Sequence, residues 1–176
     1  MGVRARRGAD LIGPAVAAAG RCVAVVGSSA SDATTDAAAE QVGRLLAEAG
    51  AVVICGGLGG VMEAACRGAA EAGGLTVGIL PGEDRAQANR WARVVIPTGL
   101  GELRNGLVVR AAESLIALGG EYGTLSEVAL ALKLGRPVVG LRTWELRRPD
   151  GRLDDGIVLA SDPADAVRLA LAAGRR

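Results

Sequence analysis

A glycine-rich stretch at residues 119–127, Gly-Gly-Glu-Tyr-Gly-Thr-Leu-Ser-Glu, has the residue types of a phosphate-binding turn. It follows an apolar run at 114–118 that predicts a strand, and it begins a pattern with helical spacing. A turn without bulky side chains between a strand and a helix gathers several free backbone N–H groups at one point, which is how many proteins bind phosphate. We therefore predict that Gly120, Gly123 and Thr124 bind an anion.

The same stretch has a second interpretation that requires no ligand. Thr124 and Glu127 have the spacing of a capping box, in which two side chains satisfy the first N–H groups of a helix. This interpretation predicts a helix that begins at Thr124 and extends to residue 134. From the residues alone, Glu127 is as consistent with a helix cap as with a carboxylate that acts on a ligand.

Three other turns rich in Gly and Ser follow predicted strands, at residues 27–29, 57–60 and 99–101. None continues as the Gly-Lys-Ser/Thr of a P-loop, and none has Gly-x-Gly-x-x-Gly spacing. No acidic residue closes the second predicted strand to bind a ribose. ATP hydrolysis and NAD binding are therefore disfavoured. The first two turns contribute these residues to the predicted anion site: Gly27, Ser28, Ser29, Gly57, Gly59 and Gly60.

Apolar runs alternate with helical patterns along most of the chain. Strands are predicted at residues 22–26, 51–55, 75–80, 94–97, 114–118 and 137–141, and helices at 34–49, 61–72, 102–112, 124–134 and 163–173. Residues 143–156 predict a turn or small hairpin, and Asp162 is the predicted cap of the last helix. Continuously apolar strands separated by helices are typical of a parallel sheet covered on both faces. We predict an α/β fold with a doubly wound, mostly parallel, Rossmann-like sheet in three α/β/α layers.

The order of the strands determines where a ligand binds in such a fold. The order commonly reverses beside the first strand, and ligands bind where the carboxyl ends of the two neighbouring strands diverge. We expect this point to lie between the first and the fourth strand. The turns after strands one, two, four and five then all lie at the same edge of the sheet.

The chain has 176 residues, which is enough for one domain with a single hydrophobic core. We predict a flexible N-terminal extension at residues 1–20, because Asp10 and Pro14 interrupt the apolar stretch that a signal peptide would need. Residues 21–176 are predicted to form a single nucleotide-binding domain. No stretch of the sequence is long enough to span a membrane.

Composition excludes several classes of function. Lys plus Arg number 20 and Asp plus Glu 19, and there are two Trp, one Tyr and no Phe, so the chain offers nucleic acid neither a positive field nor a stacking surface. The three cysteines lack Cys-x-x-Cys spacing, which favours buried thiols in the reducing cytoplasm. The absence of histidine excludes Ser-His-Asp catalysis, Cys-His catalysis and histidine-bearing zinc sites. We predict no metal site.

Several motifs together resemble one known family. They are Val-Gly-Ser-Ser at 26–29, Gly-Gly-Leu-Gly-Gly-Val-Met-Glu at 56–63, Gly-Ile-Leu-Pro-Gly at 78–82, the segment 99–105 and the segment 120–127. In this order they resemble the lysine-decarboxylase-like or LONELY GUY superfamily and, within it, the molybdenum cofactor carrier proteins. The resemblance spans residues 21–141. It implies a Rossmann-like fold, a nucleotide-type ligand and a homodimer or higher homo-oligomer.

The LONELY GUY enzymes are phosphoribohydrolases that release a base from a nucleoside 5′-monophosphate, using a Gly-Gly-x-Gly-Thr-x-x-Glu motif and an Arg-Lys pair. By resemblance, their glutamate corresponds to Glu127 and their arginine to Arg104. The Pro-Gly-Gly that opens the enzyme motif reads Gly119-Gly120-Glu121 here, Asn105 replaces the lysine, and Ser126 replaces the first of two glutamates. The Asn105 and Ser126 replacements look more like the carrier proteins. Glu121 adds a negative charge to the loop, so we expect it to point to solvent or to pair with Arg104.

Three functional hypotheses remain open. The preferred one is a carrier for a small phosphorylated ligand such as molybdenum cofactor, which requires no cofactor of its own. The alternative is a phosphoribohydrolase that cleaves a nucleoside monophosphate; Glu127 would stabilise the positive charge that develops on the ribose and orient water, while Arg104 holds the phosphate or the carboxylate. The third is a structural dimer module with an empty site.

Overall fold

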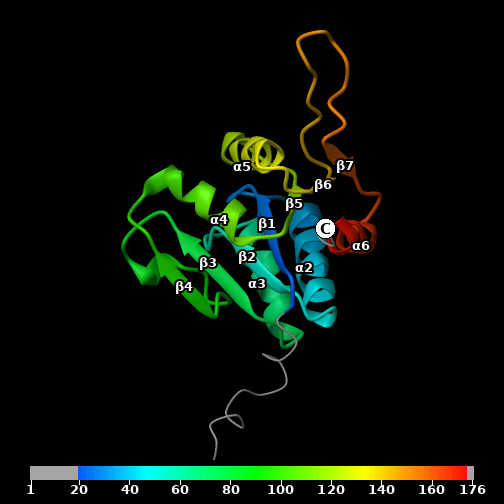
Figure 1. Ribbon diagram of the computed structural model, residues 1–176. Coiled ribbons are helices and arrows are strands. Elements are labelled where there is room, and N and C mark those ends of the chain that lie inside the picture. Colours follow the sequence, from blue (N-terminus) through cyan, green and yellow to red (C-terminus); the bar gives the residue numbers. More distant parts are fainter. Residues whose placement is uncertain (1–19, 174–176) are drawn as a thin grey trace, which may run out of the picture.

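Seven parallel strands form the central sheet of residues 20–173, the residues that the computed structural model describes (Figure 1). Their order across the sheet is β4-β3-β2-β1-β5-β6-β7. The predicted N-terminal extension lies outside the described residues except for Gly20. The strands are β1 (Cys22–Gly27), β2 (Val52–Cys55), β3 (Thr76–Leu80), β4 (Val94–Pro97), β5 (Ser114–Leu118), β6 (Val138–Leu141) and β7 (Ile157–Leu159).

Helices cover both faces of this sheet, which confirms the predicted doubly wound, Rossmann-like α/β fold (Figure 1). One face packs against α2, α3 and α6, and the other packs against α4 and α5. All five residues of β5 are buried, because a strand covered on both sides has no face for polar side chains. The helices are α2 (Ala33–Glu48), α3 (Val61–Glu71), α4 (Asn105–Ala111), α5 (Tyr122–Lys133) and α6 (Pro163–Ala173), with 3-10 turns η2 (Arg85–Gln87) and η3 (Gly101–Arg104).

The strand order reverses beside β1 as expected, but the neighbour on the far side is β5 rather than the fourth strand. β4 continues the sheet outward from β3, so it lies at the edge. Helix α4 then contacts β1 and β2 and leads the chain back to the other side of β1, where β5 pairs with it. The predicted position of the ligand site therefore moves to the carboxyl ends of β1 and β5.

Two helices begin differently from the sequence-based prediction. The helix expected at residues 102–112 is the 3-10 turn η3 followed by the shorter α4. Helix α5 begins at Tyr122, two residues before the predicted start, and Glu121 occupies its N-cap position. The capping-box interpretation of Thr124 and Glu127 is therefore wrong, since Thr124 already lies inside the first turn. The predicted cap of α6 is confirmed, because the Asp165 N–H donates to the Asp162 carboxylate at 2.8 Å.

The end of the sheet contains one strand that the sequence pattern missed. β7 has only three residues, and only Ile157 is buried, so its pattern is too short to separate from a loop. The segment between β6 and β7 extends away from the sheet (Figure 1) and contains an antiparallel bridge between Arg147 and Leu153, which confirms the predicted small hairpin. Within residues 20–173, no helix is both long and apolar enough to cross a membrane.

Candidate functional site

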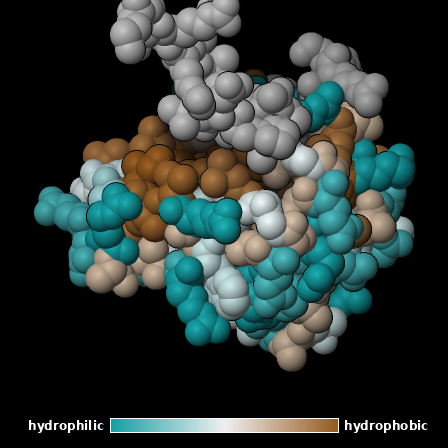
Figure 2. Space-filling model, turned by 90° about the horizontal axis from the view of Figure 1, so that it is seen from below, coloured by the Kyte–Doolittle hydropathy of each residue, from teal (hydrophilic) through white to brown (hydrophobic). Residues whose placement is uncertain are grey.

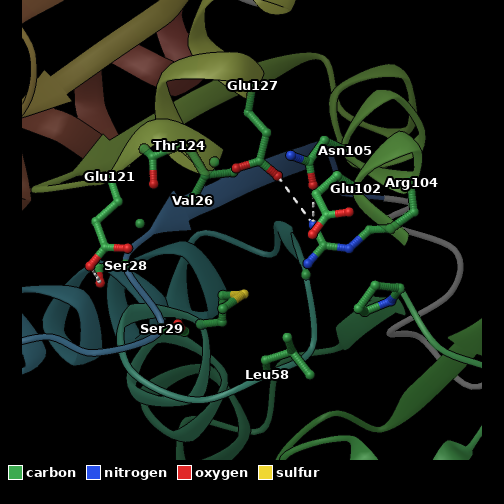
Figure 3. A pocket seen from close by; sticks show the side chains of 15 residues that line it. Val26, Ser28, Ser29, Leu58, Glu102, Arg104, Asn105, Glu121, Thr124 and Glu127 are labelled. Carbon is green, nitrogen blue, oxygen red and sulfur yellow. Dashed lines mark hydrogen bonds and ion pairs between the residues drawn. The ribbon is translucent and has the colours of Figure 1, made fainter. Parts of the chain in front are cut away.

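A cavity of about 230 Å³ lies at the carboxyl ends of β1, β2 and β5, where the strand order reverses (Figure 3). Its wall combines backbone from the turns that follow these strands with side chains from η3, α4 and α5. Most of the predicted site residues line it, but Gly57, Gly59, Gly60 and Gly120 do not. The lining residues are Val26, Gly27, Ser28, Ser29, Gly56, Leu58, Met62, Pro81, Glu102, Arg104, Asn105, Glu121, Gly123, Thr124 and Glu127.

The first turn of α5 forms one wall of this cavity through Gly123 and Thr124. Its first helical hydrogen bond runs from the Leu125 N–H to the Glu121 carbonyl at 2.9 Å. No side chain of residues 20–173 caps this helix start, although Glu121 has the extended backbone of an N-cap residue. The preceding N–H groups are therefore available to an anion, and the partial positive charge of a helix N-terminus favours one.

The turn after β1 forms the neighbouring wall, with Gly27, Ser28 and Ser29 all lining the cavity. The Ser28 hydroxyl lies 3.1 Å from Glu121 Oε1 and 2.8 Å from the Ala30 carbonyl. Glu121 thus turns towards Ser28, as Figure 3 shows, and the pairing with Arg104 that we considered is not formed. This contact joins the turns after β1 and β5 across the mouth of the cavity.

The predicted glycines after β2 lie outside the lining, whereas their neighbours Gly56, Leu58 and Met62 are part of it. Gly57 packs on β3, since a Cβ there would stand 2.9 Å from a Leu80 methyl group. Gly60 packs on the turn after β1, where a Cβ would stand 2.4 Å from the Ser28 carbonyl oxygen. Close packing therefore accounts for both glycines without a ligand.

Gly59 and Gly120 also lie outside the lining. Gly120 has φ +123°, a conformation that side chains rarely adopt, and a Cβ there would stand 2.7 Å from a methyl group of Thr124. Gly120 therefore shapes the turn that brings Thr124 to the cavity. Gly120 therefore contributes to the predicted anion site through its backbone conformation and not as a lining residue.

Arg104 and Glu127 face each other at the inner end of the cavity, with 3.5 Å between Nη1 and Oε1 (Figure 3). Their side chains are only 10% and 7% exposed. The Arg104 guanidinium lies against Gly56, where a Cβ would stand 2.5 Å from Nη2. Among the described residues, Nε of Arg104 is buried without a hydrogen-bond partner. This pair is the only contact between opposite charges that the described lining contains.

Burial determines the protonation of Glu127. Desolvation raises the pKa of its carboxyl from 4.5 to about 7, and the positive charge of Arg104 offsets this only in part. The 3.5 Å separation is at the upper limit of a hydrogen bond, so the ion pair cannot replace the lost hydration. Near neutral pH the Glu127 carboxyl therefore exchanges readily between its acid and its base form.

Two of the positions that depart from the LONELY GUY enzyme pattern, Asn105 and Ser126, contact each other. The Asn105 side-chain amide donates to the Ser126 hydroxyl at 2.9 Å, and that hydroxyl donates to the Gly123 carbonyl at 2.6 Å. Asn105 also accepts a hydrogen bond of 2.6 Å from Arg104 Nη1. A neutral hydrogen-bonded pair thus stands where the enzyme pattern has a lysine and a glutamate, and it links Arg104 to the first turn of α5.

The charges around the cavity are mainly negative. Glu102, Glu121 and Glu127 line it together with a single guanidinium, that of Arg104. Any attraction for a phosphate must therefore come mainly from backbone N–H groups and the α5 dipole rather than from net charge. No group of three or more Cys, Asp or Glu side chains in the described part of the chain is arranged to hold a metal ion.

The prediction missed several lining residues. Met62 and Pro81 lie within motifs that carried the family resemblance, so their positions were recognisable although no role was assigned. Glu102 reaches the cavity because η3 turns the chain there after β4. Val26 and Leu58 also lie within these motifs, but their apolar side chains carry no signal that separates a lining residue from a core residue.

Similar proteins include one curated sequence and two solved structures. An uncharacterized protein of Archaeoglobus fulgidus is 46% identical over 120 residues, which are 68% of this chain and 79% of that protein. The molybdenum cofactor binding protein of Rippkaea orientalis is 35% identical, with 85% of this chain and 94% of that chain covered and a TM-score of 0.76. The molybdenum cofactor carrier protein MCP of Chlamydomonas reinhardtii is 32% identical, with 89% and 99% covered and a TM-score of 0.76.

These similarities cover nearly the whole described domain and confirm the predicted resemblance to the LONELY GUY-like superfamily and its molybdenum cofactor carrier branch. Residues 20–167 match the SLOG cluster4 family, and the chain therefore belongs to that family.

Proposed function

We propose that this protein binds a phosphorylated, nucleotide-like ligand in the cavity at the carboxyl ends of β1 and β5, and that it acts as a carrier of molybdenum cofactor. The observation that carries the proposal is the first turn of α5, which lines the cavity through Gly123 and Thr124 and has no side-chain cap among the described residues. The similarity to the molybdenum cofactor proteins of Rippkaea orientalis and Chlamydomonas reinhardtii supports the choice of ligand.

The residues present fit such a ligand in two parts. Its phosphate would lie at Gly123 and Thr124, where free N–H groups line the wall. Its pterin would lie against the apolar side chains of Val26, Leu58 and Met62. A cavity of about 230 Å³ is smaller than the roughly 300–1,000 Å³ of typical ligand pockets, so part of the ligand would extend through the mouth.

The first test identifies what the protein carries. Protein expressed in a host that makes molybdenum cofactor is purified without oxygen and denatured, and the released compounds are weighed by mass spectrometry. We expect a phosphorylated pterin in near-stoichiometric amount. Equilibrium dialysis of the emptied protein with molybdenum cofactor, AMP and inorganic phosphate then ranks the ligands. Absence of a bound phosphorylated compound, together with no measurable binding of any of the three, would overturn the proposal.

One observation favours a second function, hydrolysis of the N-glycosidic bond of a nucleoside 5′-monophosphate. Glu127 is buried in the cavity wall, and its carboxyl has a pKa raised to about 7 by desolvation, which suits a group that must both donate and accept a proton. Its carboxylate form would stabilise the charge on the ribose, while Arg104 holds the phosphate. The neutral Asn105–Ser126 pair argues against it, since the enzyme pattern has charged residues there.

An assay for free base and ribose 5-phosphate separates the two functions. The protein is incubated with AMP and with other nucleoside monophosphates. Turnover that disappears in Glu127→Gln, with the fold intact by circular dichroism, would replace the carrier proposal by the enzyme. Binding of ligand without turnover on any nucleotide would eliminate the enzyme.

We also propose that the protein is a homodimer or higher homo-oligomer in the cytoplasm. The three free thiols suit a reducing compartment. Val94 and Ile96 of β4 are exposed. They lie on the sheet face that α4 and α5 cover elsewhere, since Ile96 is the partner of Ile79, which belongs to the core on that face. Figure 2 shows hydrophobic residues gathered at the left of the view, on the side where Figure 1 places β3 and β4.

Leu103 gives a test of this assembly, because it is 80% exposed and lies on η3, which contacts β3 next to β4. Light scattering coupled to size exclusion should report an oligomer for the natural protein and a monomer for Leu103→Asp. The matched control is Leu153→Asp, an exposed leucine in the hairpin between β6 and β7. A natural protein that runs as a monomer at all concentrations would contradict the proposal.

A further inference from the structure

Three sulfur atoms gather directly behind the cavity wall. The whole chain has three cysteines and two methionines. Cys55 at the end of β2 and Cys66 on α3 are completely buried, with 3.4 Å between their Sγ atoms. Met62 lies one turn before Cys66 on α3, belongs to the same buried cluster and lines the cavity. Two thiols and one thioether therefore belong to one small buried cluster of the fold.

Sulfur donors of this kind select soft metal ions. Zinc prefers four ligands, and hard ions such as magnesium and calcium prefer oxygen, whereas thiolate and thioether ligands select Cu(I). We propose that Cys55, Cys66 and Met62 form a Cu(I) site, with two thiolates and one thioether around the ion. This proposal shares Met62 with the cavity but does not require the ligand proposed there.

The surroundings of the cluster suit the charge of such a complex. Binding of Cu⁺ by two thiols releases two protons, so the buried complex has a net charge of −1 and involves no change of oxidation state. A Cβ on Gly56 would stand 2.5 Å from Arg104 Nη2 and 2.7 Å from Met62 Sδ. The Arg104 guanidinium therefore lies close to Met62 and supplies the opposite charge. The Gly57 N–H donates to Cys55 Sγ at 3.3 Å and would stabilise the thiolate.

The geometry requires only a small adjustment. Sulfur atoms about 2.3 Å from a metal ion at trigonal angles stand roughly 4 Å apart, so the thiol pair must open by about 0.6 Å. Met62 gives the ion a route towards the thiols, since it lines the cavity and belongs to their cluster. Leu58 and Trp91 pack against the cluster and limit access of water to the ion.

Trp91 supplies a direct readout. The second tryptophan, Trp144, stacks on Tyr122 instead, with ring centroids 6.1 Å apart, so Trp144→Phe leaves Trp91 as the reporter. This protein is titrated without oxygen with Cu(I) in competition with bicinchoninate. We expect one equivalent of Cu(I) to bind, two protons to be released and the Trp91 fluorescence to be quenched at the same endpoint.

Substitutions of the sulfur residues decide the assignment. Cys55→Ser and Cys66→Ser should each weaken Cu(I) binding at least a hundredfold, and Met62→Leu should weaken it about tenfold while conserving volume and fold. Cys22→Ser, which changes the cysteine outside the cluster, should bind as the natural protein does. Circular dichroism checks each fold, and Met62→Leu keeps the test decisive if a serine variant unfolds. Unchanged affinity and quenching in Met62→Leu, or loss of binding in Cys22→Ser, would overturn the proposal.

Discussion

Helices α2 and α5 begin at the same edge of the sheet, directly after the neighbouring strands β1 and β5, but their first turns are completed differently. Asp32 caps α2, since its carboxylate accepts the Thr35 N–H at 2.7 Å. Glu121 holds the same position at α5, and its carboxylate instead contacts Ser28. The α2 turn is thus satisfied by its own sequence, whereas the α5 turn offers its N–H groups to the cavity.

The difference follows from the side chains and the neighbours of the two helices. Aspartate at an N-cap is short enough to reach back to the third residue of the helix. Glutamate is one methylene longer, and here the Ser28 hydroxyl attracts it away from the helix. A helix start left without a cap costs about 1 kcal/mol of stability, which a bound anion can restore. We infer that the α5 start is kept open for a ligand.

The largest expected effect comes from a carboxylate placed in the second position of α5. Apart from its chain neighbours and the backbone of its own helix, no described atom lies within 4 Å of a Cβ added to Gly123, so Gly123→Asp fits. Repulsion between two unit charges about 4 Å apart is roughly 4 kcal/mol, which weakens phosphate binding about a thousandfold. Stability should stay equal or rise, because the charge suits the helix dipole.

The matched control is Thr34→Asp at the second position of α2, which is exposed and outside the cavity lining. Titration calorimetry with the phosphorylated ligand should give the natural affinity for this control. Equal losses of ligand affinity in Gly123→Asp and in Thr34→Asp would show that the net charge of the protein, rather than the open α5 turn, determines binding.

The second effect concerns Glu127 and pH. Because burial raises the pKa of its carboxyl from 4.5 to about 7, the folded protein binds more protons than the unfolded chain between these values. The free energy of unfolding therefore falls as pH rises through this range, by up to about 3 kcal/mol. Urea unfolding at about pH 5 and pH 8 should show this loss in the natural protein and a smaller one in Glu127→Gln. Identical pH profiles would contradict a buried, protonated Glu127.

A smaller effect is expected at the capped helix. Asp32→Ala removes the α2 cap and should lower the free energy of unfolding, with ligand affinity unchanged. The Thr35 hydrogen bond lowers the pKa of Asp32, so this contribution is present near neutral pH and is lost as the pH falls below about 4. Thermal unfolding with and without ligand measures both the stability and the ligand affinity. A loss of affinity in Asp32→Ala would mean that α2 also contributes to ligand binding.

The smallest effect comes from closing the open turn of α5. Glu121→Ser places a short hydroxyl at the N-cap, which should stabilise the free protein by about 0.5 kcal/mol and weaken phosphate binding about two- to threefold. The control Glu121→Gln removes the same charge without an effective cap, and binding should become slightly tighter. A serine variant that binds phosphate more tightly than the glutamine variant would contradict the competition between cap and ligand.

The architecture was predictable from local patterns. The run of aliphatic residues at Ser114–Leu118 is a strand as predicted, because five consecutive apolar or small residues fit only a strand covered on both faces. The last helix, Pro163–Ala173, was also predicted with the correct bounds and with its Asp162 cap. Such features depend on neighbours in sequence, so periodicity and capping chemistry are sufficient to identify them.

The details of the site depended on contacts that no local pattern contains. The capping-box prediction was wrong because α5 begins two residues earlier than predicted. At that start the Glu121 carboxylate contacts Ser28, in the turn after β1, instead of capping the helix. The contact between Asn105 and Ser126, which are 21 residues apart, arises only when α4 packs beside α5. The two buried thiols, 11 residues apart in sequence, meet in the same way when α3 packs on the sheet.

The α/β class, most strands and helices, the family, and the turns that form the site followed from the amino-acid order. The neighbour of β1, the glycines that line the cavity and the raised pKa of the Glu127 carboxyl followed only from the folded arrangement. The physical reason is the range of the interactions involved. Periodicity and turn geometry act over a few residues, whereas burial and charge pairing depend on residues that only the packed sheet and helices bring together.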